Sequence, residues 1–516
     1  MNPLLSRLAA SLFAATALLV SPVAAQEPVK LTFQKGDRVV FVGNTFAERA
    51  AEFGYLEAVL QTRLPDLGLT FRNLGYAADE VNLQPRPLNF EYYSAEGPYT
   101  LPKAGRAVPR PDPRHKFLAE LKADVIFVCY GMNESFRGAA GLADFRKSLS
   151  DLLKAYASQK YNGKTAPRIV LISPIAHENL GGELPDPAEH NKHLKLYTDA
   201  MREIAAAEKI PFVDLYTPTL ALMSEKGGDR LTINGIHLTA YGYWAVAHLT
   251  AQQLGLKAPL MRLDAGNVAG AKEVRFPAAN YRNWFSCPPP AGARVHPSLE
   301  HLQAWQKVAN LPPGKYTLQI DGRACAVASA DEWGKGVYVR VSPLHDAVER
   351  PRQAIIERDR QFFYRWRPTN TEYVYGRRAE PFGVVNFPGE MKQLDDIIRR
   401  LDARILELNK APKITSVKLV PGEGKITELA PVVNRVLSIA ELYGQEQGKI
   451  GGKIVPTALD PEEARKRFKL APGYEINLFA SEKDFPLHNP LAMQFDAQGR
   501  LWVTTLPSYP HLVPGH

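Results

Sequence analysis

The chain has 516 residues, more than a single hydrophobic core usually organises, and this length predicts about three structural units. A hydrophobic content of 45% beside a charged content of 23% excludes wholesale disorder. The formal net charge of +9 is spread over short clusters such as Arg465-Lys466-Arg467, which favours a solvated surface over nucleic-acid binding.

The first 25 residues have the order of a secretory signal. Arg7 precedes an apolar stretch from Leu8 to Val20, and the small residues Val23-Ala24-Ala25 follow. An uncleaved membrane anchor is the rival interpretation, but the stretch is shorter than the roughly 20 residues that cross a bilayer. We therefore expect residues 1–25 to be removed and the protein to be exported, periplasmic or extracellular, with no stable membrane insertion after cleavage.

Residues 26–261 alternate short β-branched runs with amphipathic helical patterns. This alternation predicts an α/β domain, with a five-stranded parallel sheet between two layers of helices in a flavodoxin-like arrangement. In such sheets ligands bind at the carboxyl ends of the strands. The five predicted strands are Arg38–Val42, Leu69–Asn73, Asp124–Val128, Ile169–Ile172 and Phe212–Leu215.

The proline-rich segment 84–112 predicts a long loop over one end of this sheet, and we interpret it as a lid. Residues 262–345 predict a small β-rich insertion, of which the alternating run Gly314–Gly322 with its Asp-Gly turn is the clearest strand. Residues 346–408 predict a helical segment that packs back on the α/β domain. Its amphipathic pattern comes from Leu394, Ile397, Leu401, Ile405 and Leu408.

The last two segments complete the division of the chain. Residues 409–460, rich in proline and glycine, predict a linker with little regular structure. Residues 461–516 contain two strand-like runs, Pro472–Phe479 and Phe495–Val503, which together predict one truncated blade of a β-propeller. Because one blade cannot bury its own faces, we expect a downstream propeller or a truncated product.

Three cysteines occur in the chain, and export would allow them to pair. Cys129 ends an apolar run and is predicted to be a buried small side chain. Cys287 and Cys325 could form one disulfide, although their spacing alone does not establish it. The sequence has no metal-ligand or haem-attachment motif, so it predicts no metal and no cofactor.

Thr45 lies where the first predicted strand turns into a helix. Backbone N–H groups and the helix dipole at such a turn stabilise a developing anion, so the Thr45 hydroxyl is a candidate nucleophile. The structural alternative is that Thr45 is a helix N-cap, with Glu48 completing a capping box.

Two later loops are predicted to reach the same edge of the sheet. Asn133, after the third strand, could donate its amide to an oxyanion, or could be a turn residue that bonds its own backbone. His237, directly before an apolar helix, could be a general base, or could pack near the helix start.

In their order along the chain, these loops resemble the four sequence blocks of the SGNH, or GDSL-like, hydrolases over roughly residues 36–255. The resemblance assigns the nucleophile to Thr45, the catalytic histidine to His237 and the triad acid position to Asn234. It assigns the oxyanion hole to Asn133 and to the backbone N–H groups of Ala78 and Thr45.

The chain departs from the family pattern at two of these positions. Thr45 keeps a hydroxyl but adds a methyl group that stiffens the side chain. Asn234 cannot stabilise an imidazolium as an aspartate does, and the comparable change in a serine protease lowers turnover by about four orders of magnitude. Some SGNH members work with a serine–histidine pair and a backbone carbonyl, so loss of the acid alone leaves catalysis open.

A second resemblance concerns residues Arg365–Asn370, which follow the aromatic run Phe362-Phe363-Tyr364. They resemble a segment of large exported planctomycete-type proteins in which an SGNH-like domain precedes a propeller of the glucose or sorbosone dehydrogenase type. The aromatic run could stack on substrate or pack in the core, and both interpretations stay open.

The function that follows is hydrolysis of an acyl or acetyl ester, on a small molecule or a glycan. The first alternative is a catalytically degenerate carbohydrate-binding or docking module that precedes the propeller. The second is that the activity belongs to a propeller dehydrogenase of which only the first blade is present.

Overall fold

The computed structural model describes residues 30–83, 93–94, 97–98, 113–182, 184–256, 262–268, 273–367, 387–427, 460–470, 473–481, 483–484 and 490–505. The predicted signal 1–25, most of the predicted lid 84–112 and residues 368–370 lie outside this range. Between residues 84 and 112 the structure describes one short hairpin, β3 (Tyr93–Ser94) with β4 (Gly97–Pro98).

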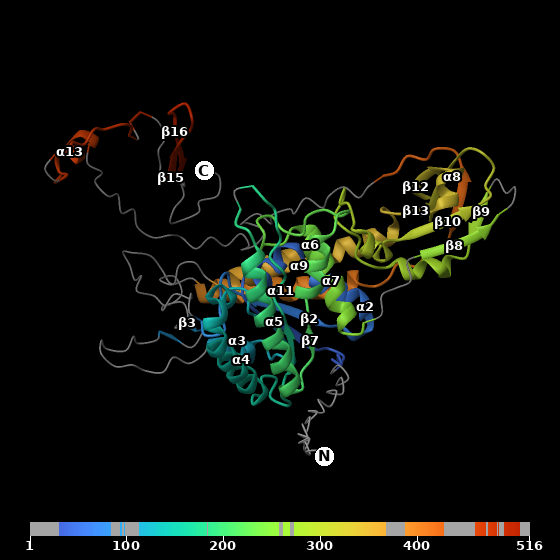
Figure 1. The fold of residues 1–516 in the computed structure, drawn as a ribbon. Helices are drawn as coiled ribbons and strands as arrows, with labels where there is room; N and C mark the ends of the chain where they lie inside the picture. The colour runs from blue at the N-terminus through green and yellow to red at the C-terminus, as the bar shows by residue number, and fades with distance from the viewer. Residues whose placement is uncertain are drawn as a thin grey trace, which may run out of the picture.

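The first part of the chain forms a parallel sheet with the strand order β2-β1-β5-β6-β7. Its strands coincide closely with the five that the sequence predicts, and the sheet lies between helices (Figure 1). The predicted three-layer α/β/α fold is thereby confirmed. The strands are β1 (Arg38–Gly43), β2 (Thr70–Gly75), β5 (Val125–Cys129), β6 (Arg168–Ile172) and β7 (Phe212–Val213).

Strand β1 shows why both faces of the sheet are covered. All of Val39 to Val42 are buried, and alternate side chains belong to different cores. Val39 and Phe41 pack against α1, α2 and α7, whereas Val40 and Val42 pack with α3, α4 and α5. The helices are α1 (Thr45–Phe53), α2 (Tyr55–Arg63), α3 (Pro113–Glu120), α4 (Leu142–Ala157), α5 (Ala188–Glu208), α6 (Tyr216–Ser224) and α7 (Ala240–Gln253), with 3-10 turns η1 (Pro65–Leu67) and η3 (Glu134–Gly141).

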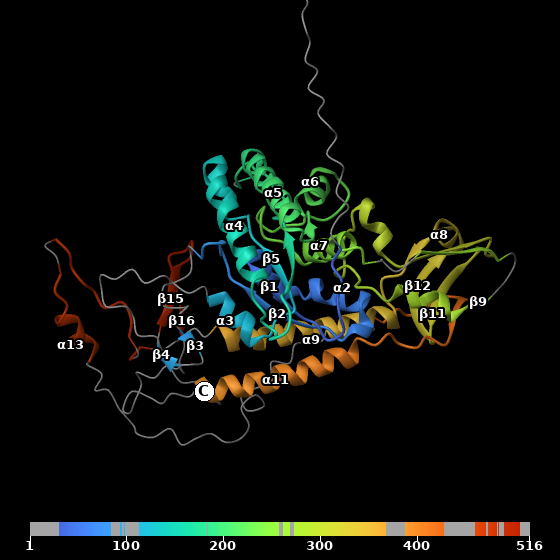
Figure 2. The ribbon, with the colours of Figure 1, turned by 90° about the horizontal axis from the view of Figure 1, so that it is seen from below.

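Two long helices, α9 (Pro343–Trp366) and α11 (Phe387–Leu408), run side by side beneath the α/β domain (Figure 2). Phe362 and Trp366 at the end of α9 pack in the same core as Leu394 of α11. Core packing is therefore the role of Phe362 in the aromatic run. The amphipathic helix predicted from Leu394 to Leu408 is confirmed.

A buried charge network joins α9 to the domain. Arg358 of α9 is 1% exposed and forms ion pairs with its neighbour Asp359, with Glu57 of α2 and with Asp402 of α11. Arg72 of β2 also binds Asp402, at 2.5 Å. The attraction within this network offsets the large desolvation penalty of burying the arginine.

The middle of the chain forms a β region at one end of the molecule (Figure 1). One sheet has the order β13-β10-β8 and the other β12-β11-β14-β9. The predicted strand within 314–322 is β11, and its Asp321-Gly322 turn leads directly into β12. The elements are β8 (Arg262–Asn267), β9 (Val274–Phe276), η4 (Ala278–Trp284), η5 (Pro297–Leu302), β10 (Trp305–Ala309), β11 (Lys315–Ile320), β12 (Arg323–Ser329), α8 (Ala330–Lys335), β13 (Val337–Tyr338) and β14 (Val417–Pro421).

Two expectations for this region need correction. Strand β14 lies inside segment 409–460, where the sequence suggested little regular structure, and it pairs with both β11 and β9. Its apolar residues Val417 and Leu419 are buried, which outweighs the nearby proline and glycine signals. Cys287 and Cys325 are both buried and unpaired, so the disulfide considered above is not formed.

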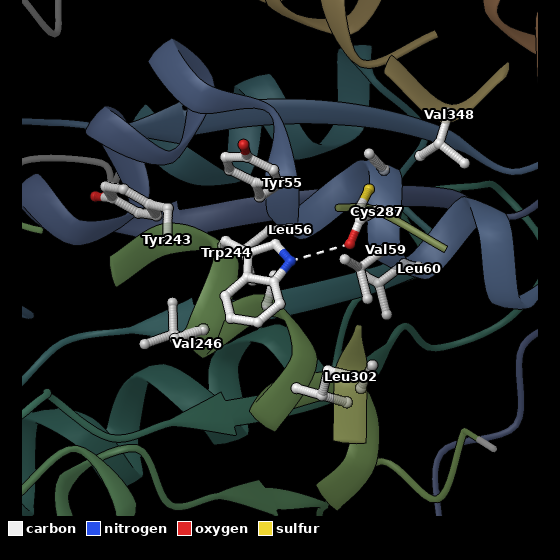
Figure 3. Close-up of a cluster of buried hydrophobic side chains, with 14 of the residues drawn as sticks. Tyr55, Leu56, Val59, Leu60, Tyr243, Trp244, Val246, Cys287, Leu302 and Val348 are labelled. Carbon is white, nitrogen blue, oxygen red and sulfur yellow. Dashed lines mark hydrogen bonds between the residues drawn. The ribbon is translucent and has the colours of Figure 1, made fainter. Parts of the chain in front are cut away.

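The β region joins the α/β domain through a buried cluster between α2, α7 and segment 284–302 (Figure 3). Trp244 of α7 is fully buried and donates its indole N–H to the Cys287 carbonyl at 3.0 Å. At this junction the apolar surface of the indole is therefore buried and its N–H group has a hydrogen-bond acceptor.

The last described part contains α13 (Pro461–Lys466) and a hairpin of β15 (Pro490–Phe495) and β16 (Leu501–Thr505). The hairpin turns at Asp496–Gly499, inside the predicted run Phe495–Val503, whereas residues 473–480 form no strand. One predicted strand of the blade is thus wrong. None of the helices in the described ranges is long and apolar enough to cross a membrane.

Candidate active site

Thr45 is the first residue of α1, directly after β1. Asn44, not Thr45, is the N-cap, because its side chain accepts the Phe46 N–H at 3.1 Å. The capping alternative for Thr45 is therefore wrong, and Glu48 instead pairs with Arg367. Because Gly43 has no side chain, the end of β1 can lie close to the backbone of β5; a Cβ at this position would lie 2.2 Å from the Cys129 carbonyl oxygen. The Thr45 hydroxyl is left free of helix capping.

The Ala78 backbone N–H donates to Thr45 Oγ1 at 2.8 Å. Ala78 has φ +58°, a left-handed conformation that turns its N–H toward Thr45. The next residue anchors the loop, because the buried Asp79 carboxylate accepts the Tyr130 hydroxyl at 3.1 Å. The predicted nucleophile and the predicted oxyanion donor are thus in direct contact.

Asn133 lies after β5 and directly before η3, whose first residue, Glu134, is buried. The two carboxyl oxygens of Glu134 accept the N–H groups of Val81 and Gly131, both at 2.9 Å. Burial raises the pKa of Glu134 to about 7. This one side chain therefore ties the Ala78 loop to the Asn133 loop.

His237 and Asn234 lie in the loop before α7 and contact each other. The imidazole Nδ1 of His237 is 2.9 Å from Asn234 Nδ2 and 3.1 Å from Asn234 Oδ1. Asn234 Oδ1 also accepts the His237 backbone N–H at 3.1 Å. The side chain at the family's acid position thus holds the imidazole at Nδ1, as the resemblance implies.

Thr45, Asn133 and His237 line one cavity of about 30 Å³. The predicted convergence of distant loops at one sheet edge is therefore present in the structure. Between Thr45 and the His237 ring, however, there is no direct hydrogen bond among these described residues. The other lining residues are Asn44, Phe46, Cys129, Tyr130, Met132, Ser173, Pro174, Ile175 and Ile236.

The electrostatics of this cavity favour a neutral imidazole. Burial lowers the pKa of His237, and the positive charge of Arg49 on α1 lowers it further. Because its ordinary pKa is near 6.5, a lowered value leaves His237 neutral at pH 7. A neutral imidazole can accept a proton, which is what a general base must do.

Two residues that support the site were missed from the sequence. The buried Glu178 carboxylate accepts the Thr232 N–H at 2.7 Å and the Thr232 hydroxyl at 2.5 Å, at the start of the Asn234–His237 loop. Ser173 Oγ accepts the Leu215 N–H at 2.8 Å and joins the ends of β6 and β7. Glu178 and Ser173 bind backbone groups of residues that are distant in sequence, so no local sequence motif predicts their role.

Arg367, at the end of α9, contacts residues on two of the segments that carry the site. Its guanidinium lies 3.8 Å from the centroid of the Tyr76 ring and binds Glu48 of α1 at 2.5 Å. It therefore links α9 to the Ala78 loop and to the nucleophile helix.

Within the described ranges, no three His, Cys, Asp or Glu side chains lie so that they could hold a metal ion.

The sequence of residues 42–245 matches the GDSL-like Lipase/Acylhydrolase family, and residues 460–515 match a Domain of unknown function (DUF7133). No curated protein matches the chain. An acetylxylan esterase from Geobacillus stearothermophilus is 17% identical over 44% of this chain and 98% of its own, with a TM-score of 0.32. An alpha/beta hydrolase enzyme from the metagenome of Lake Arreo, Spain, is 17% identical over 43% and 97%, also with 0.32.

A gut microbial diltiazem-metabolizing enzyme has a similar fold, with a TM-score of 0.51 and 17% identity, over 76% of this chain and 98% of its own. Since residues 42–245 are less than half of the chain, this likeness extends beyond the α/β domain. The fusion to a propeller stays a prediction. Residues 42–245 are thus similar in sequence to the GDSL-like lipase/acylhydrolase family, and the five-stranded parallel sheet that begins at Arg38 has the three-layer α/β/α fold of these hydrolases.

Proposed function

We propose that this domain hydrolyses esters of short acyl groups, such as acetyl, carried by a carbohydrate or another small alcohol. One observation carries the proposal: a hydroxyl, an amide and a neutral imidazole from three loops line the same cavity.

The first chemical step uses the groups that meet at Thr45. Rotation of the Thr45 side chain about χ1 breaks the hydrogen bond that its hydroxyl accepts from the Ala78 N–H. His237 then takes the hydroxyl proton while Oγ1 forms a bond to the acyl carbon. The carbonyl oxygen then becomes an oxyanion that accepts from the freed Ala78 N–H, the Thr45 N–H and the Asn133 amide. Asn234 orients the imidazole through Nδ1.

The second step releases the products. The carbon–oxygen bond to the alcohol breaks, and the alcohol leaves with the proton from His237. Water then attacks the acyl-Thr45 ester with His237 as base, which gives the acid and restores the threonine hydroxyl.

The test is hydrolysis of p-nitrophenyl acetate, butyrate and octanoate by the full chain, with Thr45→Ala and His237→Ala variants. We expect acetate to be the best substrate and each variant to lower kcat by about three orders of magnitude. Thr45→Ser is the matched control, since it keeps the hydroxyl, and it should be at least as active as the natural chain. Unchanged turnover in Thr45→Ala would show that another group attacks.

A carbohydrate-binding module without turnover is the second candidate. It is favoured by the Thr45 hydroxyl, which accepts from Ala78 rather than bonding His237, and by asparagine at position 234. Binding of acetylated glycans, with no acetate released by the natural chain, would support this candidate instead.

We also propose that the protein is exported and that residues 1–25 are removed. The support is the charge, hydrophobic and small-residue order of that segment. Amino-terminal sequencing of the mature protein from the cell envelope or medium should give Gln26 first; a mature chain that keeps Met1 would contradict export by cleavage.

A further inference from the structure

A network of hydrogen-bonded side chains leads from the Asn133 loop to α5. Ser135, two residues after Asn133, is fully buried and donates its hydroxyl to the Met132 carbonyl at 2.6 Å. The same Oγ lies 2.8 Å from His190 Nε2 on α5. The exposed Phe136 ring stacks on the His190 ring, with centroids 4.0 Å apart.

From His190 the network of side-chain contacts extends to the loop that carries His237. His190 Nδ1 lies 3.0 Å from Nδ1 of His177, which is in the loop after β6. The His177 ring packs against Gly235, where a Cβ would come within 2.6 Å of Nε2. The next residue, Glu178, donates its backbone N–H to the Gly235 carbonyl at 2.8 Å.

The hydrogen bonds that link Ser135, His190 and His177 can be directed in only one consistent way. Because the Ser135 proton goes to the Met132 carbonyl, His190 Nε2 must carry a proton and donate to Ser135. A neutral His190 then has a lone pair at Nδ1, so His177 must donate from its own Nδ1. Protonation of His190 would add an N–H at its Nδ1, face to face with the N–H that His177 already directs there.

We propose that His177 and His190 are a pair of positioning residues that hold the Asn133 loop and the His237 loop at a fixed separation. The pair touches no reacting atom. As a role in catalysis, this rests on the ester hydrolysis proposed above; as a contact between loops, it rests on the geometry alone.

The surroundings of the pair keep both rings neutral near pH 7. Burial, His177 and His193 lower the pKa of His190 to about 4, and burial lowers that of His177. His193, also on α5, lies 3.6 Å from the Glu189 carboxylate, and Glu178 follows His177 in the chain with its carboxylate bound to Thr232.

The kinetic experiment compares His190→Leu, which removes both nitrogens, with His190→Gln, which keeps a donor toward Ser135. With p-nitrophenyl acetate, we expect kcat of His190→Leu to fall about ten- to a hundredfold with KM changed less than about twofold, since misplaced groups slow the chemical step. His190→Gln should be intermediate. His301→Leu, an exposed histidine in η5, is the matched control. Circular dichroism should show all variants folded, and unchanged kcat in folded His190→Leu would overturn the catalytic role.

The second experiment needs no activity. In spectra of the full chain labelled with ¹⁵N at its histidine and asparagine residues, we expect coupling between His177 Nδ1 and His190 Nδ1 and a proton on His190 Nε2. In His190→Leu, both the His237 ring and the Asn133 amide signals should shift. If only one loop responds, or if His190 carries its proton on Nδ1, the pairing is wrong even where the chain proves to be an active esterase. If the natural chain hydrolyses no ester but both loops respond, only the proposed function fails.

Discussion

Asn234 leaves the tautomer of His237 undecided, because it offers both an amide N–H and a carbonyl oxygen to Nδ1. If the N–H donates, the ring proton sits on Nε2 and the imidazole cannot act as the base. If the oxygen accepts, the proton sits on Nδ1 and Nε2 is free. An aspartate would allow only the second arrangement.

We therefore predict that Asn234→Asp raises kcat at pH 7 by about tenfold or more, in the direction opposite to the loss seen when a triad aspartate becomes asparagine. Steady-state hydrolysis of p-nitrophenyl acetate measures the change. Asn179→Asp, in the nearby loop after β6, adds the same charge without touching His237 and should leave kcat unchanged. Equal gains in both variants would attribute the effect to net charge.

Arg49 affects the same imidazole through its charge, and this gives a pH prediction. Arg49→Met removes a nearby cation, so the pKa of His237 should rise toward its ordinary value. Since the neutral ring is the base, the acid limb of kcat/KM should move to higher pH and activity at pH 5 should fall. Arg146→Met, exposed on α4, should leave the profile in place; a shift to lower pH in Arg49→Met would contradict the assignment.

At the scale of residues, the sequence predicted the groups that line the cavity because each follows a strand of a parallel sheet. Thr45, Asn133 and His237 could be found in this way. Glu178 and His190 could not, because their partners are backbone groups and side chains that only the folded chain brings near. The capping alternative for Thr45 failed because Asn44 competes for the same N–H groups one residue earlier.

At the scale of elements, α9 depends on one buried cation. We predict that Arg358→Met lowers the free energy of unfolding by about 3–5 kcal/mol, because Glu57 and Asp359 would stay buried without their partner. Urea unfolding followed by circular dichroism measures the loss. Arg360→Met, whose surface pair with Glu357 is partly solvated, should cost less than about 1 kcal/mol. Similar losses in the two variants would argue against the buried network.

Element prediction succeeded where a periodic pattern was long or repeated. Strands β1, β2, β5 and β6 and helices α4, α5 and α11 follow the apolar periodicity of the sequence. The short strand β14 was missed because its five residues stand among proline and glycine, and only pairing with β11 and β9 makes it a strand.

At the scale of the whole molecule, the junction with the β region contains a buried histidine, His248 of α7, whose protonated form the fold disfavours. It accepts from Arg63 at Nδ1 and lies 3.3 Å from the Cys287 carbonyl at Nε2, and its buried position lowers its pKa to about 3. A histidine whose folded pKa lies below its unfolded value near 6.5 stabilises the fold above pH 6.5. That stability is lost as the pH falls toward 3.

We predict that the natural chain loses stability between pH 7 and pH 4.5 and that His248→Gln loses about 2 kcal/mol less over this interval. Urea unfolding at the two pH values gives the comparison. His301→Gln, which is exposed, should lose as much stability as the natural chain. An identical loss in His248→Gln would show that other groups set the acid response.

Strand β14 has a consequence for how the chain becomes folded during synthesis. As the polypeptide leaves the ribosome, β9 and β11 appear long before residues 417–421, and the place between them stays vacant until α9 and α11 have been made. The second sheet can therefore close only after both long helices exist. A nascent chain halted at residue 408 would expose two unpaired strand edges, the kind of surface that chaperones recognise and that promotes aggregation.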